Sequence, residues 1–210
     1  MPGLIPANGG TSVVGDGNGD GVVDSAQANV TSVNFRQTDT VSTKPTAPVT
    51  FVSLVADSKE GAIDTTDANN AQLTKFEQKD APDKLPVGVN MPLGLISFTA
   101  TVGLVPLASD GTRIGITETF SLFVDDSLGI NGYWKQNNAG TWVNLASDVY
   151  GGKVTDVGTK LRLDFQIQDG GEFDADGKVD GIITDPGAAA YLPHSLLDNT
   201  LHLPTDGFWF

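Results

Sequence analysis

The residues best suited to chemistry lie in a short acidic loop at residues 16–24, where oxygen-bearing side chains alternate with glycine. Carboxylates packed this closely repel one another unless a cation lies between them. Ca²⁺ accepts about 6–8 oxygen ligands, whereas Mg²⁺ keeps more of its water. The spacing places ligands at loop positions 1, 3, 5, 7 and 9, which here are Asp16, Asn18, Asp20, the Val22 carbonyl and Asp24. The sequence therefore predicts a Ca²⁺ site in this loop.

The end of this loop differs from an EF-hand. Gly21 at position 6 allows the sharp backbone turn, but position 12 is Gln27 instead of the bidentate glutamate, and the flanking sequence is not helical. The loop therefore resembles the Ca²⁺ loops of dockerins and thrombospondin type 3 repeats. The alternative is a solvated Asp/Gly turn that binds no ion.

A second acidic loop follows the strand-like run at residues 161–168. Counting from Asp174 puts Lys178 at position 5, where an ammonium group cannot bind a cation. Counting from Glu172 gives a workable set, with Gly177 at the turn: Glu172, Asp174, Asp176, the Lys178 carbonyl and Asp180. We expect a second Ca²⁺ site here, with an acidic hairpin turn as the alternative.

Enzyme chemistry has little support in the sequence. There is no Gly-x-Ser-x-Gly nucleophile turn, no phosphate-binding glycine loop and no cysteine. His194 and His202, the only histidines, would need a third ligand to form a zinc site. Glu118 and Asp164 could form a glycosidase pair, but carboxylates are common on the outer faces of strands. We expect that the chain is not an enzyme.

Two positions suggest self-modification. Lys135 has the most apolar surroundings of the lysines, so a Lys–Asn isopeptide bond that releases ammonia is one hypothesis. The Asp185–Pro186 bond resembles bonds that self-cleave when Ca²⁺ binds, although those modules prefer histidine where this chain has Gly187.

The composition favours a β fold. The chain of 210 residues contains 22 Asp but only 4 Glu, together with 25 Gly and 11 Pro. Asp, Gly and Pro favour turns, whereas Glu is the acid compatible with helices. A short helix is conceivable near residues 71–76, and hairpin turns are expected at 131–132 and 138–140. Strand-like runs occupy residues 30–35, 49–55, 95–102, 114–124, 132–135, 141–145 and 161–168. The sequence predicts an all-β fold, an antiparallel β-sandwich with acidic calcium-binding loops and little helix.

We expect three parts: a Gly/Asp-rich calcium-loop segment at 1–29, a β-sandwich body at 30–190, and a Pro/aromatic tail at 191–210 that packs on the body or on a neighbour. The β-rich run at 30–35 would either complete the sheet of a neighbouring copy, giving a head-to-tail filament, or fold back as an edge strand of its own domain. Removal of residues 1–35 would dissolve polymers in the first case.

Charge and hydropathy exclude two classes of partner. The net charge is −14 with only 12 basic residues, which disfavours nucleic acid. No apolar run approaches the length of a membrane span, so we expect no membrane insertion. Tyr133, Trp134 and Trp142 could instead form a sugar-stacking platform, although cross-strand aromatic pairs more often pack within a sheet.

Several motifs together resemble the bacterial choice-of-anchor U domain. They lie at residues 91–98, 131–135, 169–177 and 184–187, and the resemblance covers roughly residues 50–190. It implies an extracellular location on large bacterial surface proteins and a structural or adhesive role. No sorting motif follows in this sequence, so we expect an internal module or a secreted subunit. The expected function is that of an extracellular calcium-binding structural or adhesive domain, and a carbohydrate-binding module is the alternative.

Overall fold

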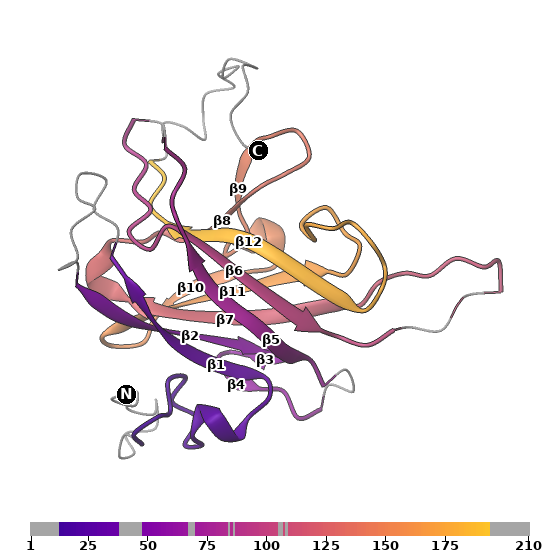
Figure 1. Cartoon of the computed structure of the whole chain (residues 1–210), viewed down its shortest axis with the longest axis horizontal. Coiled ribbons are helices and arrows are strands. Elements are labelled where there is room, and N and C mark those ends of the chain that lie inside the picture. The colour runs from indigo at the N-terminus through magenta and orange to yellow at the C-terminus, as the bar shows by residue number, and fades with distance from the viewer. Residues whose placement is uncertain are drawn as a thin grey trace.

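Two five-stranded antiparallel sheets form the body of the protein (Figure 1). The computed structural model describes residues 13–37, 48–66, 70–83, 85, 87–104, 107 and 109–193. The first sheet has the order β1 (Val30–Arg36), β2 (Val49–Ala56), β7 (Thr117–Asp125), β11 (Lys160–Gln168) and β10 (Lys153–Asp156). The second has the order β5 (Gln72–Lys79), β6 (Leu95–Thr101), β12 (Ile182–Ala190), β8 (Gly132–Gln136) and β9 (Trp142–Asn144). The prediction of an all-β, sandwich-like fold is confirmed.

Short elements fill the connections. A small two-stranded sheet joins β3 (Ser58–Lys59) to β4 (Ala62–Ile63). Single 3-10 turns lie at η1 (Asp24–Ala26), η2 (Asp126–Leu128) and η3 (Asp148–Tyr150). The connections contain no longer helix in the parts that the structure describes, as the excess of Asp over Glu led us to expect.

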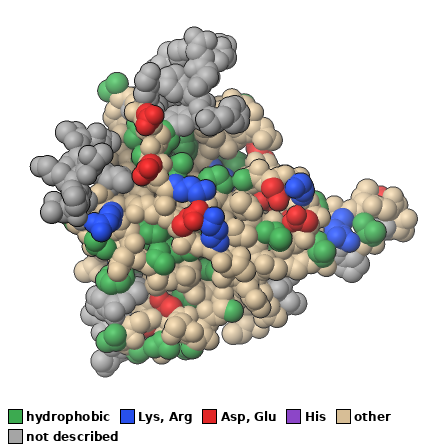
Figure 2. All heavy atoms as spheres, viewed as in Figure 1, with side chains coloured by type: hydrophobic (Ala, Val, Ile, Leu, Met, Phe, Trp, Pro, Cys, Tyr) green, Lys and Arg blue, Asp and Glu red, His purple; other side chains and the backbone are tan. Residues whose placement is uncertain are grey.

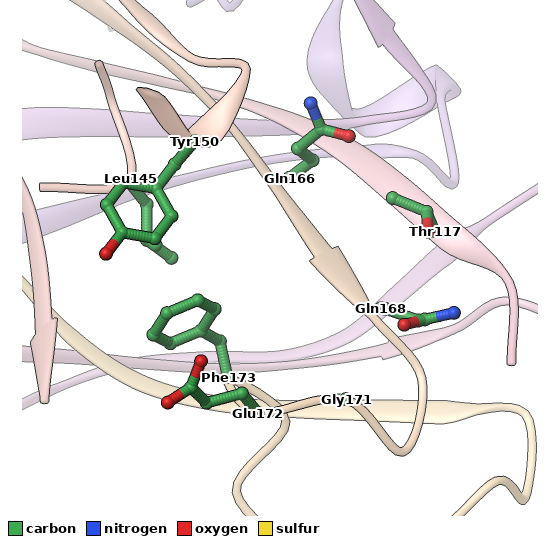
Figure 3. Close-up of a pocket in the computed structure, with 8 residues that line it drawn as sticks. All are labelled: Thr117, Leu145, Tyr150, Gln166, Gln168, Gly171, Glu172 and Phe173. Carbon is green, nitrogen blue, oxygen red and sulfur yellow. The ribbon is translucent and has the colours of Figure 1, made fainter. Parts of the chain in front are cut away.

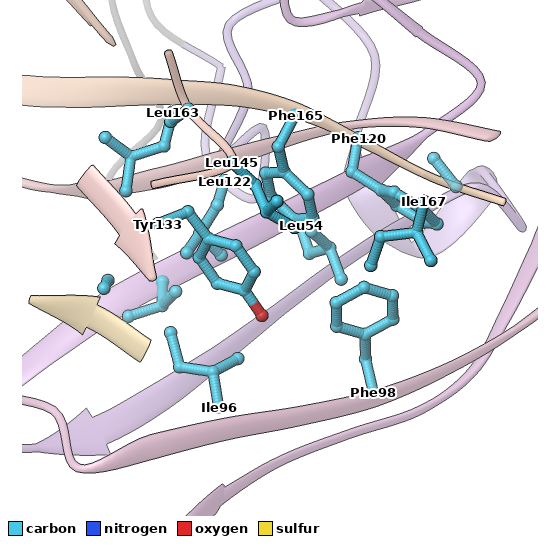
Figure 4. Close-up of a cluster of buried hydrophobic side chains, with 14 of the residues drawn as sticks. Leu54, Ile96, Phe98, Phe120, Leu122, Tyr133, Leu145, Leu163, Phe165 and Ile167 are labelled. Carbon is cyan, nitrogen blue, oxygen red and sulfur yellow. The ribbon is translucent and has the colours of Figure 1, made fainter. Parts of the chain in front are cut away.

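The core lies between the two sheets and is rich in aromatic rings (Figure 4). The ring of Phe120 on β7 is centred 4.9 Å from that of Phe98 on β6 and 5.5 Å from that of Phe165 on β11. Phe165 in turn stacks on Tyr133 of β8 at 4.0 Å. Large rings from both sheets thus meet in one cluster, and their removal from water supplies much of the driving force for folding.

The expected alternation in β11 is present. Leu163, Phe165 and Ile167 are buried in the core, whereas Asp164 and Gln166 are only partly covered. Period-2 burial of this kind fixes the register of the strand, because a slip of one residue would exchange the two faces.

The corner between β1 and β5 is closed by a side chain. Gln78 of β5 accepts a hydrogen bond from the N–H of Arg36 (2.9 Å) and donates to the carbonyl of the same residue (2.6 Å). Its amide also donates to the Leu93 carbonyl. At the opposite end of β5, the N–H of Leu73 donates to the carbonyl of Ala28, just before β1. The Gln78 amide therefore takes the place of a partner strand at the end of β1.

The helix expected near residues 71–76 is wrong, because this segment belongs to β5. A β-bulge between Leu73 and Lys75 adds one residue to the strand. The bulge puts Leu73 and Phe76 on the core side although they are three residues apart. Apolar residues at this spacing resemble one face of a helix.

One prediction about turns is also corrected, and one strand was missed. The hairpin at 131–132 is wrong, because β7 and β8 belong to different sheets. Strand β12 was not predicted, since Asp185, Pro186 and Gly187 form a turn-like sequence in its middle. By contrast, the hairpin at 138–140 is confirmed as the connection between β8 and β9.

The terminal segments meet the body where they are described. In this chain β1 pairs with β2 over seven residues, from Val30 opposite Val55 to Arg36 opposite Val49. Only the first residues of the expected tail are described, and there Leu192 is buried in a small second cluster with Trp134. His194, His202 and the rest of the tail lie outside the described residues.

Replacing Phe120 by alanine should lower the free energy of unfolding by about 3–5 kcal/mol, because it removes a buried ring and leaves a cavity. Urea unfolding followed by fluorescence measures this change. Val149→Ala is the control, since Val149 is 87% exposed and its loss should change stability by less than about 0.5 kcal/mol. Equal effects of the two substitutions would show that the core is wrongly placed.

Candidate functional site

Asp16 organises the N-terminal acidic loop. Its carboxylate is buried and accepts hydrogen bonds from three backbone N–H groups, those of Gly19 (2.6 Å), Asp20 (3.2 Å) and Gly21 (2.8 Å). Loop N–H groups that leave water must find acceptors, and one carboxylate here serves three of them. The position-1 aspartate therefore shapes the turn whether or not an ion is present.

Two amide side chains of this loop converge on one carboxylate oxygen. Asp20 Oδ2 accepts hydrogen bonds from Asn18 Nδ2 (3.1 Å) and Gln27 Nε2 (2.7 Å). The oxygens of the same two amides, Asn18 Oδ1 and Gln27 Oε1, are buried and have no hydrogen-bond donor. Gln27, which the predicted ligand set left out, is thus brought to the loop from position 12.

Asp24 turns toward the sheet instead. It accepts the N–H of Gly17 (2.8 Å) and the hydroxyl of Ser32 on β1, which also bonds Ser53 of β2. Burial raises the pKa of Asp24, and the Ser32 hydrogen bond partly opposes that rise. Val22 is exposed at the outside of the turn. Among the described residues, no group of three or more Asp, Glu or His side chains is placed to hold a metal ion.

In the second acidic loop the deepest carboxylates bind the backbone. Asp174 accepts the N–H groups of Gly170 (2.8 Å) and Thr184 (2.9 Å). Asp169 accepts those of Asp180 (3.3 Å) and Gly181 (3.0 Å). Burial raises the pKa of Asp169. Asp169 was not a predicted site residue, and its long-range role follows from a loop closure that local spacing does not reveal.

The other predicted ligands of this loop point to separate places. Glu172 accepts a long hydrogen bond from the N–H of Asn138 in the β8–β9 hairpin. Asp176 bonds the N–H of Lys178, and Asp180 bonds that of Ile182, each closing its own exposed turn. The structure does not bring the five residues together.

A buried pair of carboxyl groups lies at the end of β7. Glu118 is fully buried, and its Oε1 accepts the N–H groups of Asp57 (2.7 Å) and Thr119 (2.8 Å). Asp57 is also buried, and its Oδ2 accepts Asn29 Nδ2 and the N–H of Ala71, both at 2.6 Å. One oxygen of each acid, Asp57 Oδ1 and Glu118 Oε2, has no donor.

A proton on Glu118 supplies the hydrogen-bond donor that the two buried carboxyl groups lack. Burial, and then the negative charge of Asp57, raise the pKa of Glu118 to about 8. At neutral pH Glu118 therefore carries a proton, and it can donate to Asp57. The sequence had paired Glu118 with Asp164, but Asp164 instead bonds Ser121 and Arg162.

A second buried polar cluster joins the inner faces of β8 and β12. Lys135 is 4% exposed and forms an ion pair with Asp185, which is 0% exposed. The hydroxyl of Tyr133 donates to the other oxygen of Asp185. Burial raises the pKa of Asp185, against the effect of the Lys135 charge. Gly187 makes room, since a Cβ there would lie 2.5 Å from the Tyr133 hydroxyl oxygen.

Two shallow hollows open on the surface. The first has a volume of about 280 Å³ and is shown in Figure 3. Tyr150 meets Phe173 there edge to face at 5.7 Å, while Gln166 and Gln168 line the side formed by β11. The second hollow, about 350 Å³, is lined in part by Trp134 and Trp142.

The three aromatic residues proposed as a sugar platform do not share one surface. Tyr133 is 0% exposed and belongs to the central core, whereas Trp134 is 2% exposed and packs in the second cluster on the opposite face of β8. Trp142 is half-buried. The stacking function would require exposed ring faces, and here only the ring of Trp142 is partly open.

Charged groups are interspersed on the visible face of the molecule. Figure 2 shows Lys and Arg side chains beside Asp and Glu side chains, with no broad patch of one sign. No helix among the described residues is long and apolar enough to cross a membrane.

Comparison with protein-family models, with curated proteins and with solved structures finds no match to this chain. The resemblance to choice-of-anchor U domains therefore stays a prediction that rests on the motifs quoted above.

The proton on Glu118 predicts a pH-dependent stability. The folded pKa of about 8 exceeds the ordinary value of 4.5, so the folded state holds a proton that the unfolded state releases between these pH values. The stabilisation is complete below about pH 4.5 and falls by about 1.4 kcal/mol per pH unit until it is lost above about pH 8. Urea unfolding from about pH 5 to about pH 8 measures it.

Glu118→Gln is the matched variant, because a neutral amide keeps the acceptor for the two N–H groups and a donor for Asp57. The two proteins should have similar unfolding free energies near pH 5, and the wild type should become progressively less stable than this variant as the pH rises toward about 8. Parallel pH profiles for the two proteins would contradict a protonated Glu118.

Proposed function

We propose that the chain is a structural β-sandwich module of an extracellular bacterial surface protein, and that Ca²⁺ bound at the 16–27 loop stiffens its N-terminal edge. One observation carries the proposal: the amide oxygens of Asn18 and Gln27 are buried without donors beside the carboxylate of Asp20. A buried polar atom without a partner costs free energy, so its persistence calls for a ligand.

The donor set suits a hard cation. In the structure the N–H groups of the two amides donate hydrogen bonds to the Asp20 carboxylate and stabilise its negative charge. Rotation of each amide about its last side-chain bond would exchange nitrogen for oxygen and let a cation take over that role. Carboxylate and amide oxygens are the ligands that Ca²⁺ takes in proteins. The remaining oxygens would come from the Val22 carbonyl, from water, or from Asp16, which the loop already uses for its backbone.

The position of the loop supports a bracing role. In the structure Asn18 Nδ2 also donates to the Gly61 carbonyl, which places the loop against the turn between β3 and β4; rotation of this amide toward a cation would exchange that hydrogen bond for the contact with the ion. Asp24 reaches Ser32 on β1, and η1 leads directly into that strand. A cation that fixed residues 16–27 would therefore hold β1 against β2, and β1 is the edge strand of its sheet.

Two further features favour a structural role over an enzymatic one. The buried ionisable groups, Glu118 with Asp57 and Lys135 with Asp185, lie inside the sandwich away from the two hollows. The motifs similar to choice-of-anchor U domains support the location on a bacterial surface protein. An adhesive role and assembly with neighbouring copies belong to the same proposal.

Ca²⁺ should raise the melting temperature of the wild-type chain relative to EDTA. An ion that binds only the folded state stabilises it by about 2.7 kcal/mol at a hundredfold excess over Kd. Extracellular modules bind Ca²⁺ at about 10⁻⁴–10⁻³ M, so about 10 mM Ca²⁺ is a suitable concentration. Differential scanning calorimetry in both buffers makes the measurement.

Asp20→Asn should abolish the Ca²⁺ effect, because it removes the charge on which both amides converge. Asp176→Asn is the control: it makes the same change in an exposed turn of the second loop, and it should respond to Ca²⁺ as the wild type does. Equal melting temperatures of the wild type in Ca²⁺ and in EDTA would disprove the calcium mechanism.

A further inference from the structure

Lys135 and Asp185 face each other in the interior of the protein, where they are 4% and 0% exposed. Their strands are neighbours in the second sheet, where Trp134 of β8 pairs with Ala188 of β12. Each side chain points to the inner face, as do Tyr133 and Ala189 of the central cluster. The Nζ atom of Lys135 lies against Oδ1 of Asp185. Both residues lie beyond the last pair of this ladder, Trp134 with Ala188, and the two adjacent strands place an amine and a carboxyl group together.

Burial of an ion pair at this position costs free energy. Removal of two full charges from water costs several kcal/mol for each ion, and their mutual attraction often fails to compensate. Transfer of one proton from the Lys135 ammonium to the Asp185 carboxylate turns the pair into a neutral amine and a neutral acid. Burial raises the pKa of Asp185 and so favours this neutral form. An amine and a carboxylic acid are the reactants of amide formation.

We propose that Lys135 and Asp185 become joined by an isopeptide bond that the folded chain forms by itself. The Nζ atom attacks the carboxyl carbon of Asp185, a C–N bond forms, and a C–O bond of the acid breaks. The departing hydroxyl takes a proton from Nζ and leaves as water. The reaction converts one ammonium and one carboxylate into one amide and one water molecule, and needs no oxidant or cofactor.

Tyr133 is placed to assist this reaction. Its hydroxyl donates to Oδ2 of Asp185 and would stabilise the negative charge that develops on that oxygen during attack. Burial and the nearby Asp185 carboxylate raise the pKa of Tyr133 well above its ordinary value, so the hydroxyl stays protonated. The ring is held by stacking on Phe165, and Gly187 leaves space for the hydroxyl.

Confinement favours the amide. In bulk water the acid and the amine are preferred, because water is in vast excess. Well-oriented groups within one molecule react as if at about 10⁵–10⁸ M, and the core excludes the water that would reverse the reaction. The product would also remove two charges from the interior, and with them the cost of burying an ion pair.

The bond would close a loop between two residues that are 50 positions apart in the sequence. A cross-link of this kind constrains the unfolded chain much as a disulfide does, and this chain contains no cysteine. The inference does not depend on the proposed Ca²⁺ site, so each can fail without the other.

Intact mass spectrometry of the denatured wild-type chain is the first test. The expected mass is lower than the sequence mass by one water molecule, in Ca²⁺ and in EDTA alike. Digestion with trypsin should yield residues 114–153, uncut at Lys135, joined to residues 179–210. A mass equal to that of the sequence overturns the proposal. Two fragments that separate between Asp185 and Pro186 would also overturn it, because they would show cleavage.

Matched variants identify the reacting groups. Lys135→Arg keeps the positive charge but lacks a nucleophilic amine, so it should have its full sequence mass. Asp185→Asn should lose one ammonia and end with the same linked product as the wild type. Loss of water by the Lys135→Arg variant would place the bond elsewhere and refute the assignment.

Tyr133→Phe tests the role of the hydroxyl, since it keeps the ring that stacks on Phe165. The chain is refolded from denaturant and sampled over time for the loss of water. We expect the bond to form about 10²–10³-fold more slowly than in the wild type, as for other single hydrogen-bond donors to a developing charge. An unchanged rate would remove Tyr133 from the reaction.

Discussion

Backbone N–H groups in long connections must find acceptors when they pack against the body of a protein, and this constraint governs most of the structure. The described residues form two five-stranded sheets and include no long helix, so many loop N–H groups leave water without a regular partner. Buried aspartates meet this need. Asp16, Asp169 and Asp174 each accept two or three backbone N–H groups from their own loop or from the adjoining strand. The excess of Asp over Glu follows, because the shorter side chain reaches back to nearby backbone.

This use of carboxylates changes how the net charge of −14 should be understood. Several acids are not free surface charges, since they are compensated by backbone dipoles, as at Asp16, or by a proton, as at Glu118. Exposed ion pairs such as Lys75 with Glu77 contribute little by comparison. The stability of the loops therefore depends on where carboxylates are buried more than on how many bases surround them.

The fold class could be predicted from the sequence because alternation in strands such as β11 is a local property. Strand β12 could not be predicted in this way, because Asp185, Pro186 and Gly187 are typical of turns. They occupy a central strand because of their long-range contacts. Asp185 meets Lys135, Pro186 is exposed, and Gly187 accommodates the Tyr133 hydroxyl. Local rules tend to fail at positions where polar groups are buried for a purpose.

Partners within the candidate sites were harder still to predict. Lys135 and Asp185 each lie in a recognisable local motif, but their pairing depends on strand order, which no local pattern encodes. Asp57 belongs to an acidic stretch, and the sequence gives no sign that its carboxylate turns inward. A positive φ of 49° at Asp57 accompanies that inward turn. Gln27 was set aside because it is not the glutamate of an EF-hand, although its amide reaches Asp20.

The Gln78 amide at the end of β1 bears on how molecules of this protein meet one another. The unpaired N–H and C=O groups of an open sheet edge can hydrogen-bond to a strand of another molecule, and such pairing is a common route to amyloid-like aggregation. Gln78 already occupies the N–H and the carbonyl of Arg36 that an incoming strand would need. An incoming strand would have to break both bonds or pair only with the part of β1 that precedes Arg36. One glutamine thus acts as a safeguard against unwanted polymer growth at this edge, and it does so without a charge or a proline.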